Sequence, residues 1–166
     1  MRHILSVTVN NQPAVLARIS GLFSRRNFNI TSLNVGETES PEYSRMTIVV
    51  EGNKDTLEQV KKQLYKLIDV IKITELNQAN MIERDMAIIK VNCGKKLRNQ
   101  VIQVVDVFRG KVVDFSPESI SVEITGDENK INAFIEIMKD FGIRDIVRTG
   151  IVAMDREINN KVVLNS

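Results

Sequence analysis

The chain has 166 residues, which is enough for one mid-sized domain or for two small ones with buried cores. Hydrophobic residues make up 43% of it and charged residues 27%, as in an ordinary soluble globular protein. Its 23 basic and 21 acidic residues give a formal charge of +2, so the sequence lacks the excess of Lys and Arg that binding to nucleic-acid phosphates requires.

The first part of the chain predicts a strand, a turn and a helix. Residues 3–9 alternate between apolar and polar side chains, which is typical of a strand with one buried face. A turn follows, and Pro13 is suited to the first turn of a helix. Apolar residues then recur at helical spacing up to Asn27, which closes the helix because it tolerates a left-handed conformation.

Two strands, a helix and a further strand complete this first unit. The strands are predicted at 30–35 and 45–50, and the polar loop 36–42 between them is too long for a tight hairpin. A helix capped by Asn53 follows, and 70–76 forms the fourth strand. The order βαββαβ is that of the ferredoxin-like arrangement.

The second half of the chain repeats this order. Its predicted elements are a strand at 87–93, a helix at 97–108 that ends at Gly110, strands at 111–115 and 119–125, a helix capped by Asp127, and a last strand within 145–154. The spacing from Phe23 to Gly52 is 29 residues, whereas that from Phe108 to Gly126 is 18. The second unit therefore lacks 11 residues of the hairpin between its middle strands, as expected for a diverged duplication.

The predicted fold class is α+β, with two ferredoxin-like βαββαβ domains in tandem whose antiparallel sheets carry helices on one face. We expect the first domain at 1–76, a short ordered linker at 77–84, the second domain at 85–155 and a tail at 156–166.

Few residues suit catalysis or metal binding. His3 is the only histidine, and no cluster of His, Cys and carboxylates has metal-ligand spacing. Cys93, the only cysteine, falls on the core-facing side of its strand, where a small buried hydrophobe is expected. Neither a Walker A nor a Rossmann glycine motif is present. We therefore predict no catalytic residue, metal site or cofactor on this chain.

The same features predict a cytoplasmic, soluble protein. A single cysteine excludes an internal disulfide and fits a reducing compartment. The first ten residues are too polar for a signal peptide, and no apolar run approaches the roughly 18 residues that span a bilayer.

One segment has the chemistry of a ligand site. The first strand ends near Asn11 and leads directly into a helix, whose free N-terminal N–H groups suit a carboxylate. Asn11 and Asn29 add side-chain donors and acceptors that could hold the ammonium of an amino acid. Two interpretations stay open here: a site for a zwitterionic amino acid, or an Asn11 that only serves the turn and an Asn29 that only caps a strand.

At these residues the chain resembles the small, regulatory subunits of acetolactate synthase, also called acetohydroxyacid synthase. The resemblance covers nearly the whole chain and is most specific over 1–76. Its main blocks are Asn11-x-x-Ala14-Val15-Leu16-x-Arg18, Gly21-Leu22-Phe23-Ser24 with Phe28-Asn29-Ile30, and Ser44-Arg45-Met46-Thr47, with sparser matches at Glu83-Arg84 and Phe108-Arg109-Gly110.

This resemblance implies an N-terminal ACT domain, a homodimer formed through it, and a large catalytic subunit as partner. That subunit would carry thiamine diphosphate, Mg²⁺ and FAD, and the small subunit would raise its activity and confer feedback inhibition by valine, or by leucine or isoleucine. The effector would lie where Asn11, Pro13, Ala14, Val15 and Leu16 of one subunit meet Asn29 and Ile30 of the other. The family usually has Gly where this chain has Ala14, so the extra methyl group is expected to restrict this site.

Two other functions share this fold. RNA-binding modules of the RRM type stack bases on aromatic side chains of the central strands, where this chain offers Phe115 as the only ring. An acylphosphatase-like enzyme would use Asn11 and Arg18, but Pro13 lacks the N–H that a phosphate cradle needs. Both patterns are poor matches, and we expect no nucleic-acid partner and no membrane association.

Overall fold

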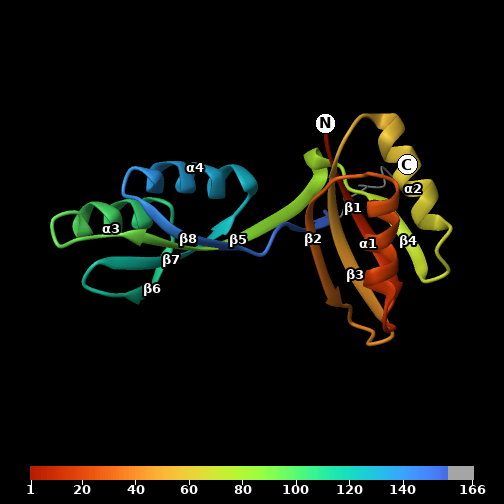
Figure 1. Ribbon diagram of the computed structural model, residues 1–166, viewed down its shortest axis with the longest axis horizontal. Helices are drawn as coiled ribbons and strands as arrows, with labels where there is room; N and C mark the ends of the chain where they lie inside the picture. The colour runs from red at the N-terminus through yellow and green to blue at the C-terminus, as the bar shows by residue number, and fades with distance from the viewer. Residues whose placement is uncertain (157–166) are drawn as a thin grey trace, which may run out of the picture.

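The computed structural model describes residues 1–156, which form two modules joined by a long strand (Figure 1). The first module contains β1 (Arg2–Asn10), α1 (Val15–Arg25), β2 (Ile30–Glu37), β3 (Tyr43–Glu51), α2 (Lys54–Tyr65) and β4 (Val70–Glu75). After the 3-10 turn η1 (Gln78–Asn80), the second contains β5 (Met81–Asn92), α3 (Arg98–Val107), β6 (Lys111–Phe115), β7 (Ser119–Gly126), α4 (Glu128–Lys139), β8 (Ile143–Arg148) and β9 (Val152–Asp155).

Both sheets are antiparallel and have equivalent strand orders. The first is β2-β3-β1-β4, and the second is β6-β7-β5-β8, with β9 paired to β5 away from this path. In Figure 1, α1 and α2 lie on one face of the first sheet, and α3 and α4 lie on one face of the second. The predicted fold class, a tandem of ferredoxin-like βαββαβ units, is confirmed.

Each module has its own apolar core between sheet and helices. In the first, alternate residues of β1 such as Leu5 and Val7 pack against Ile19 and Phe23 of α1. In the second, Ile89 of β5 occupies the same layer as Phe134 of α4. The alternation of apolar residues in the strands and their helical period in the helices thus place the two cores correctly.

The helix ends follow most of the predicted capping residues. Asn53 and Asp127 each accept a hydrogen bond from a backbone N–H of the first helical turn, at 2.8 Å in both cases. Asn27 has a left-handed φ of 56°, as predicted. The end of α3 differs, because Arg109 rather than Gly110 takes the left-handed conformation, with φ at 55°. Gly110 has no positive φ, but an added Cβ would lie 3.2 Å from the carbonyl of Glu123.

A two-stranded ribbon connects the modules and corrects one prediction. Residues 81–84, predicted as part of a linker, are the first residues of β5 and pair with 152–155 of β9. The single strand predicted within 145–154 is instead two strands, β8 and β9. These strands could not be seen locally, because the partners lie about 70 residues apart. The predicted domain limits, 1–76 and 85–155, stay predictions.

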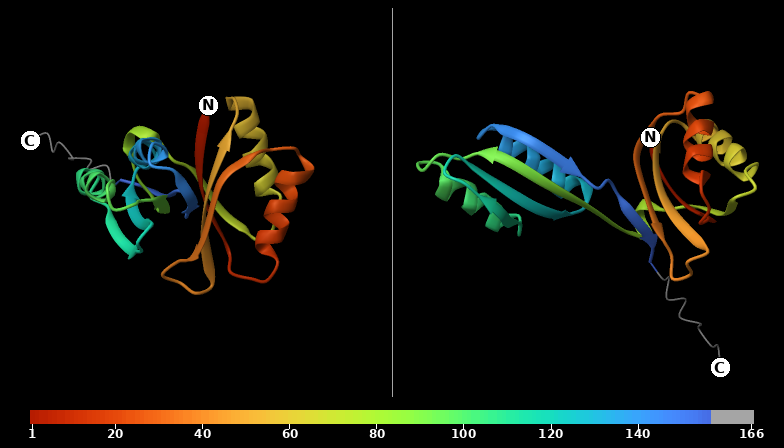
Figure 2. Two further views of the ribbon diagram at one scale, coloured as in Figure 1. Left: turned by 60° about the vertical axis from the view of Figure 1, so that its left-hand side comes forward. Right: turned by 60° about the horizontal axis from the view of Figure 1, so that its bottom comes forward.

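The ribbon lies against the first sheet on the face opposite its helices, as two views in Figure 2 show. A third apolar cluster joins Ile4 and Val49 of this face to Met81, Ile151 and Ala153 of the ribbon. Polar contacts fix the same junction: Ser32 Oγ accepts from the Ile151 N–H at 3.0 Å. The part of this face around Ile4 and Val49 is therefore covered within the chain.

The predicted tail, 156–166, lies outside the described residues except for Arg156, whose N–H donates to the Asn80 carbonyl at 2.9 Å. Among the helices of residues 1–156, none has the length and apolar character needed to cross a membrane.

Candidate functional site

The turn between β1 and α1 has an unusual backbone. Ala14 precedes the first residue of α1 with φ 68° and ψ 1°, in the left-handed region that favours glycine. Pro13 lies directly before this residue, near the first turn of α1 as predicted. Because Ala14 has a methyl side chain, it cannot cap the helix, and no side-chain cap is present.

Asn11 joins the turn to the hairpin between β2 and β3. Its Nδ2 donates to the Pro41 carbonyl at 2.9 Å and to Glu37 Oε1 at 3.2 Å, and its backbone N–H donates to the Glu42 carbonyl at 2.8 Å. Both side-chain partners are acceptors, so the amide nitrogen must face them and Oδ1 must point away. Within residues 1–156, that oxygen accepts no hydrogen bond and is free for a donor.

The first turn of α1 provides free backbone donors. The Val15 N–H donates to the Gln12 carbonyl, and the first helical bond within α1 runs from the Arg18 N–H to the Ala14 carbonyl at 3.0 Å. The N–H groups of Leu16 and Ala17 therefore have no acceptor inside the helix. Arg18 forms an ion pair with the buried carboxylate of Asp69, so its charge is compensated within the fold. A carboxylate is the ligand that such a helix end favours.

The structure brings five of the seven predicted site residues together and separates the other two. Asn11, Pro13, Ala14, Val15 and Leu16 form the turn and the first helical turn, whereas Asn29 and Ile30 lie beyond the other end of α1. A helix of 11 residues is about 16 Å long, so one amino acid cannot contact both groups in one chain. Val15 is buried in the core, while Leu16 is 46% exposed.

The second module has no equivalent of this turn. Its α3 follows Leu97, which has a right-handed φ of −97° and makes no side-chain cap. The connection between β6 and β7 covers only 116–118. It contacts the start of α3 through Arg98, which donates to the Ser116 and Pro117 carbonyls at 3.2 and 2.9 Å, and not through an asparagine.

Residues with catalytic chemistry are few and are engaged in the fold. His3 lies 3.2 Å from the Gly52 carbonyl and 3.4 Å from a carboxylate oxygen of Glu75. Cys93 is buried, with its Sγ 3.9 Å from the Gly94 carbonyl. Over residues 1–156, no group of three or more His, Cys, Asp or Glu side chains could hold a metal ion.

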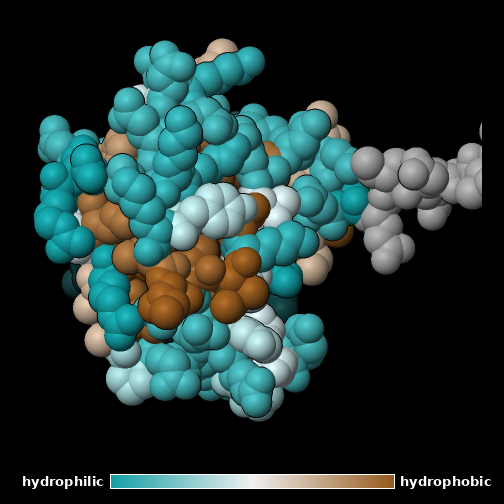
Figure 3. Space-filling view, turned by 90° about the vertical axis from the view of Figure 1, so that its right-hand side faces the viewer, coloured by the Kyte–Doolittle hydropathy of each residue, from teal (hydrophilic) through white to brown (hydrophobic). Residues whose placement is uncertain are grey.

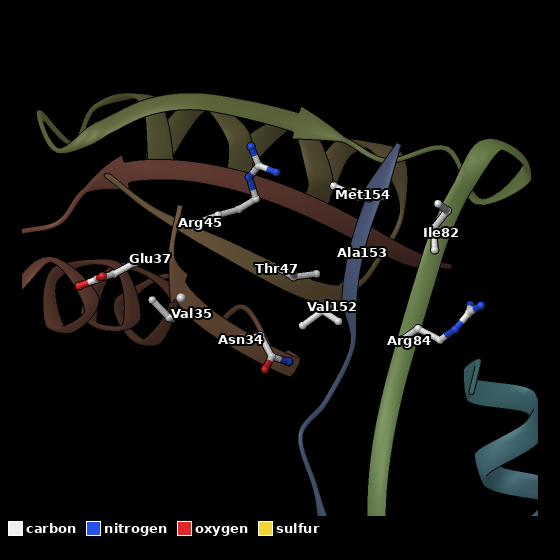
Figure 4. Close-up of a pocket in the computed structure, with 11 residues that line it drawn as sticks. Asn34, Val35, Glu37, Arg45, Thr47, Ile82, Arg84, Val152, Ala153 and Met154 are labelled. Atoms are coloured by element: carbon white, nitrogen blue, oxygen red, sulfur yellow. The ribbon is translucent and has the colours of Figure 1, made fainter. Parts of the chain in front are cut away.

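A groove that the sequence did not predict lies beside the ribbon. It has a volume of about 360 Å³ and runs between β2, β3 and β9 (Figure 4). Its lining includes Val35, Arg45, Arg84, Val152 and Met154. The sequence gives one indication of this groove. Arg45 and Arg84 belong to the blocks that resemble the family, yet neither has a predicted role in the core or in the turn. Since the groove depends on the pairing of β5 with β9, its existence could not be inferred from local patterns.

Comparisons with protein families match both modules. Residues 5–72 match the AHAS small subunit-like ACT domain, and residues 84–157 match a family described as the small subunit of acetolactate synthase.

Individual relatives cover nearly the whole chain. The acetolactate synthase small subunit of Mycobacterium leprae is 51% identical over 154 residues, which is 93% of this chain and 91% of that protein. The one from Aquifex aeolicus is 48% identical over 161 residues, or 96% of this chain and 84% of that protein. Among solved structures, the acetolactate synthase small subunit of Thermotoga maritima has a TM-score of 0.88 at 43% identity, covering 95% of this chain and 99% of that one.

Proposed function

Because the chain belongs to the acetolactate synthase small-subunit family, we propose that it activates the large catalytic subunit and makes it sensitive to feedback inhibition by valine. The observation that carries the proposal is the turn around Ala14, which leaves free N–H groups at the start of α1 and a free side-chain oxygen on Asn11. Thiamine diphosphate, Mg²⁺ and FAD belong to the catalytic subunit in this proposal, and the complex works in the cytoplasm.

The effector would bind between two first modules. β2 is the edge strand of its sheet, and a twofold axis beside it would reverse the direction of the partner's α1. The turn of one subunit would then lie next to Asn29 and Ile30 of the other, which a single chain keeps apart. Figure 3 shows that apolar surface is exposed on the helical side of this module. Leu16 belongs to that side, and its exposure supports burial by a partner.

Each part of valine finds a matching group in this arrangement. The carboxylate would accept from the Leu16 and Ala17 N–H groups at the start of α1. The ammonium would donate to Asn11 Oδ1, whose orientation is fixed by Glu37 and Pro41. The branched side chain would pack against Leu16 and against the partner's Ile30. Leucine and isoleucine differ only in the size of this apolar part and are weaker candidates for the same site.

Feedback inhibition would then result from linkage between valine binding and the pairing geometry of the two subunits. Valine bound across the interface stabilises the paired geometry that it fits, and the catalytic subunit responds to the geometry that dominates. Asn11 connects these events, because it contacts the effector on one side and the β2–β3 hairpin on the other.

Calorimetric titration with valine tests the proposal. We expect the wild type to bind valine and Asn11→Ala to bind it at least about tenfold more weakly, since a charge-assisted hydrogen bond contributes roughly 1.5–3 kcal/mol. Asn99→Ala, at an exposed position of α3, is the matched control and should bind like the wild type.

Two results would contradict the proposal. Equal valine affinity of wild type and Asn11→Ala would place the effector elsewhere. A wild type that neither binds valine nor changes the activity of the catalytic subunit would reject the regulatory function itself.

A further inference from the structure

The outward face of the second sheet, on the side away from α3 and α4, carries apolar side chains. Ile88, Val113 and Val147 are 41%, 51% and 62% exposed on this face. An antiparallel sheet with one solvated face normally alternates apolar residues inward and polar residues outward. Large aliphatic side chains on three of its four strands therefore indicate a surface that is covered in the working protein.

Charged side chains flank the apolar ones in a regular register. Ile88 of β5 is directly opposite Val147 of β8, and in the next row Lys90 is directly opposite Asp145. With Val113 they border a hollow of about 300 Å³. Lys90 and Asp145 form no ion pair within residues 1–156.

In the first module, the equivalent face of the sheet is partly covered by another segment of the chain. There Ile4 and Val49 point away from the helices and are buried by the ribbon residues Met81, Ile151 and Ala153. In the second module, no segment of residues 1–156 covers the outward face, and all five residues of β6 are exposed.

We propose that the outward faces of two second modules, from two copies of the chain, pack against each other around a twofold axis. An axis parallel to the strands and midway between β5 and β8 places Lys90 over the other copy's Asp145 and Ile88 over the other copy's Val147, twice each. The face is thus complementary to itself in charge and in apolar character.

The alternatives fit this surface less well. An axis between β5 and β7 would place β6 over β8, and Asp114 would meet Asp145 with the same sign of charge. A nucleic acid would meet two carboxylates, Asp114 and Asp145, around the single cation Lys90 in this hollow.

The contact is small, since only two strands of each sheet overlap fully. Stable isolated dimers bury roughly 800 Å² per partner, more than such an overlap offers. The pairing therefore strengthens an assembly held by other contacts rather than forming one alone, as in multivalent binding. It goes beyond the proposed valine site, because it involves no residue of the first module.

Sedimentation equilibrium of the full chain with exchanged charges tests the pairing. Lys90→Glu alone and Asp145→Lys alone each place like charges opposite each other twice, so each should self-associate about tenfold more weakly than the wild type. An equimolar mixture restores opposite charges at both contacts and should recover association to within about threefold of the wild type. Val147→Asp should also weaken association, whereas Val107→Asp on α3, 79% exposed on the helical side, should not.

The mixture distinguishes a loss of pairing from a folding defect. Mixing adds no new chain, so association that recovers in the mixture shows that both variants were folded and lacked only a partner of opposite charge. Single variants that associate like the wild type, or a mixture no stronger than its components, would overturn the proposal. Variants that self-associate normally but no longer bind the catalytic subunit would also overturn it and would assign the face to that partner.

Discussion

The two modules share a core but differ in what surrounds it. Both have the same strand order and bury equivalent apolar positions between sheet and helices. On the opposite face, the first sheet is covered by the ribbon, while the second sheet leaves Ile88 and Val147 exposed. The repeated sequence pattern therefore determines the inner layer only, and the outer faces have diverged for different contacts.

The turns at the start of α1 and α3 differ in the same way. Ala14 takes a left-handed conformation next to Asn11, which the long β2–β3 hairpin holds in place. Leu97 has a right-handed conformation, and its module has a short hairpin. The features that suit an amino-acid ligand are therefore confined to the first module.

The largest difference in stability between the two modules is expected when a carboxylate is placed on the outer face of each sheet. Val49 is 1% exposed beneath the ribbon, so we expect Val49→Asp to lower the free energy of unfolding by about 4 kcal/mol, since a buried carboxylate would have no partner. Val147→Asp, at 62% exposure, should change it by less than about 0.5 kcal/mol at low protein concentration. Urea denaturation measures both values. Similar losses in the two variants would show that the faces are covered alike.

The helix caps should show where the modules remain the same. Asn53 caps α2 and Asp127 caps α4 with identical bond lengths of 2.8 Å to the N–H three residues later. We expect Asn53→Ala and Asp127→Ala each to cost about 1 kcal/mol of stability. Thermal or urea unfolding provides the measurement. A difference above roughly 1 kcal/mol between them would mean that the modules do not unfold as equivalent units.

Local patterns were sufficient for the repeated core and insufficient for the contacts between modules. The strand of 3–9 and the capped helix after Asn53 could be predicted because periodicity and capping are properties of neighbouring residues. The pairing of 81–84 with 152–155 could not, because it depends on how the whole second module folds back.

The candidate site was predicted in part for the same reason. The strand–turn–helix order predicts a role for Asn11, and the family resemblance one for Ala14. The positive φ of Ala14 shows why glycine suits this position. The bonds from Asn11 to Glu37 and Pro41 depend on where the hairpin lies, which the sequence did not show. Asn29 lies at the other end of α1, so in the proposed site it would have to act from a second chain.

Glycine substitutions at the left-handed residues measure how much backbone strain each turn carries. A left-handed non-glycine residue costs about 1–2 kcal/mol, partly offset by the larger entropy of glycine in the unfolded chain. Ala14→Gly and Arg109→Gly should therefore each stabilise the protein by about 0.5 kcal/mol, whereas Ala17→Gly, inside α1, should destabilise it by a similar amount.

Of the two substitutions at left-handed residues, only Ala14→Gly should change the affinity for valine. We expect Ala14→Gly to bind valine more tightly in calorimetry, because the methyl group no longer restricts the turn, while Arg109→Gly binds it as the wild type does. An Ala14→Gly variant with weaker valine binding would contradict the proposed position of the effector.

The smallest effect concerns an ion pair that links helix and sheet in the first module only. Lys61 of α2 donates to Glu58 at 2.9 Å and to Glu75 of β4 at 3.2 Å, whereas Lys139 pairs with Glu136 within α4. The hydrogen bond between Glu58 and Lys61 lowers the pKa of Glu58 and raises the pKa of Lys61. The stabilisation from this bond is thus fully present at a pH above the ordinary Glu58 pKa of 4.5 and below the ordinary Lys61 pKa of 10.5.

Lys61→Met should therefore destabilise the protein slightly more than Lys139→Met at neutral pH, and by less than either cap substitution. This stabilisation is lost as the pH falls through the Glu58 pKa of the folded state, because protonated Glu58 no longer attracts Lys61. The two variants should consequently converge in urea unfolding once the pH lies below that pKa. A difference that persists there would show that the aliphatic part of Lys61, packed between α2 and β4, stabilises the first module more than its charge does.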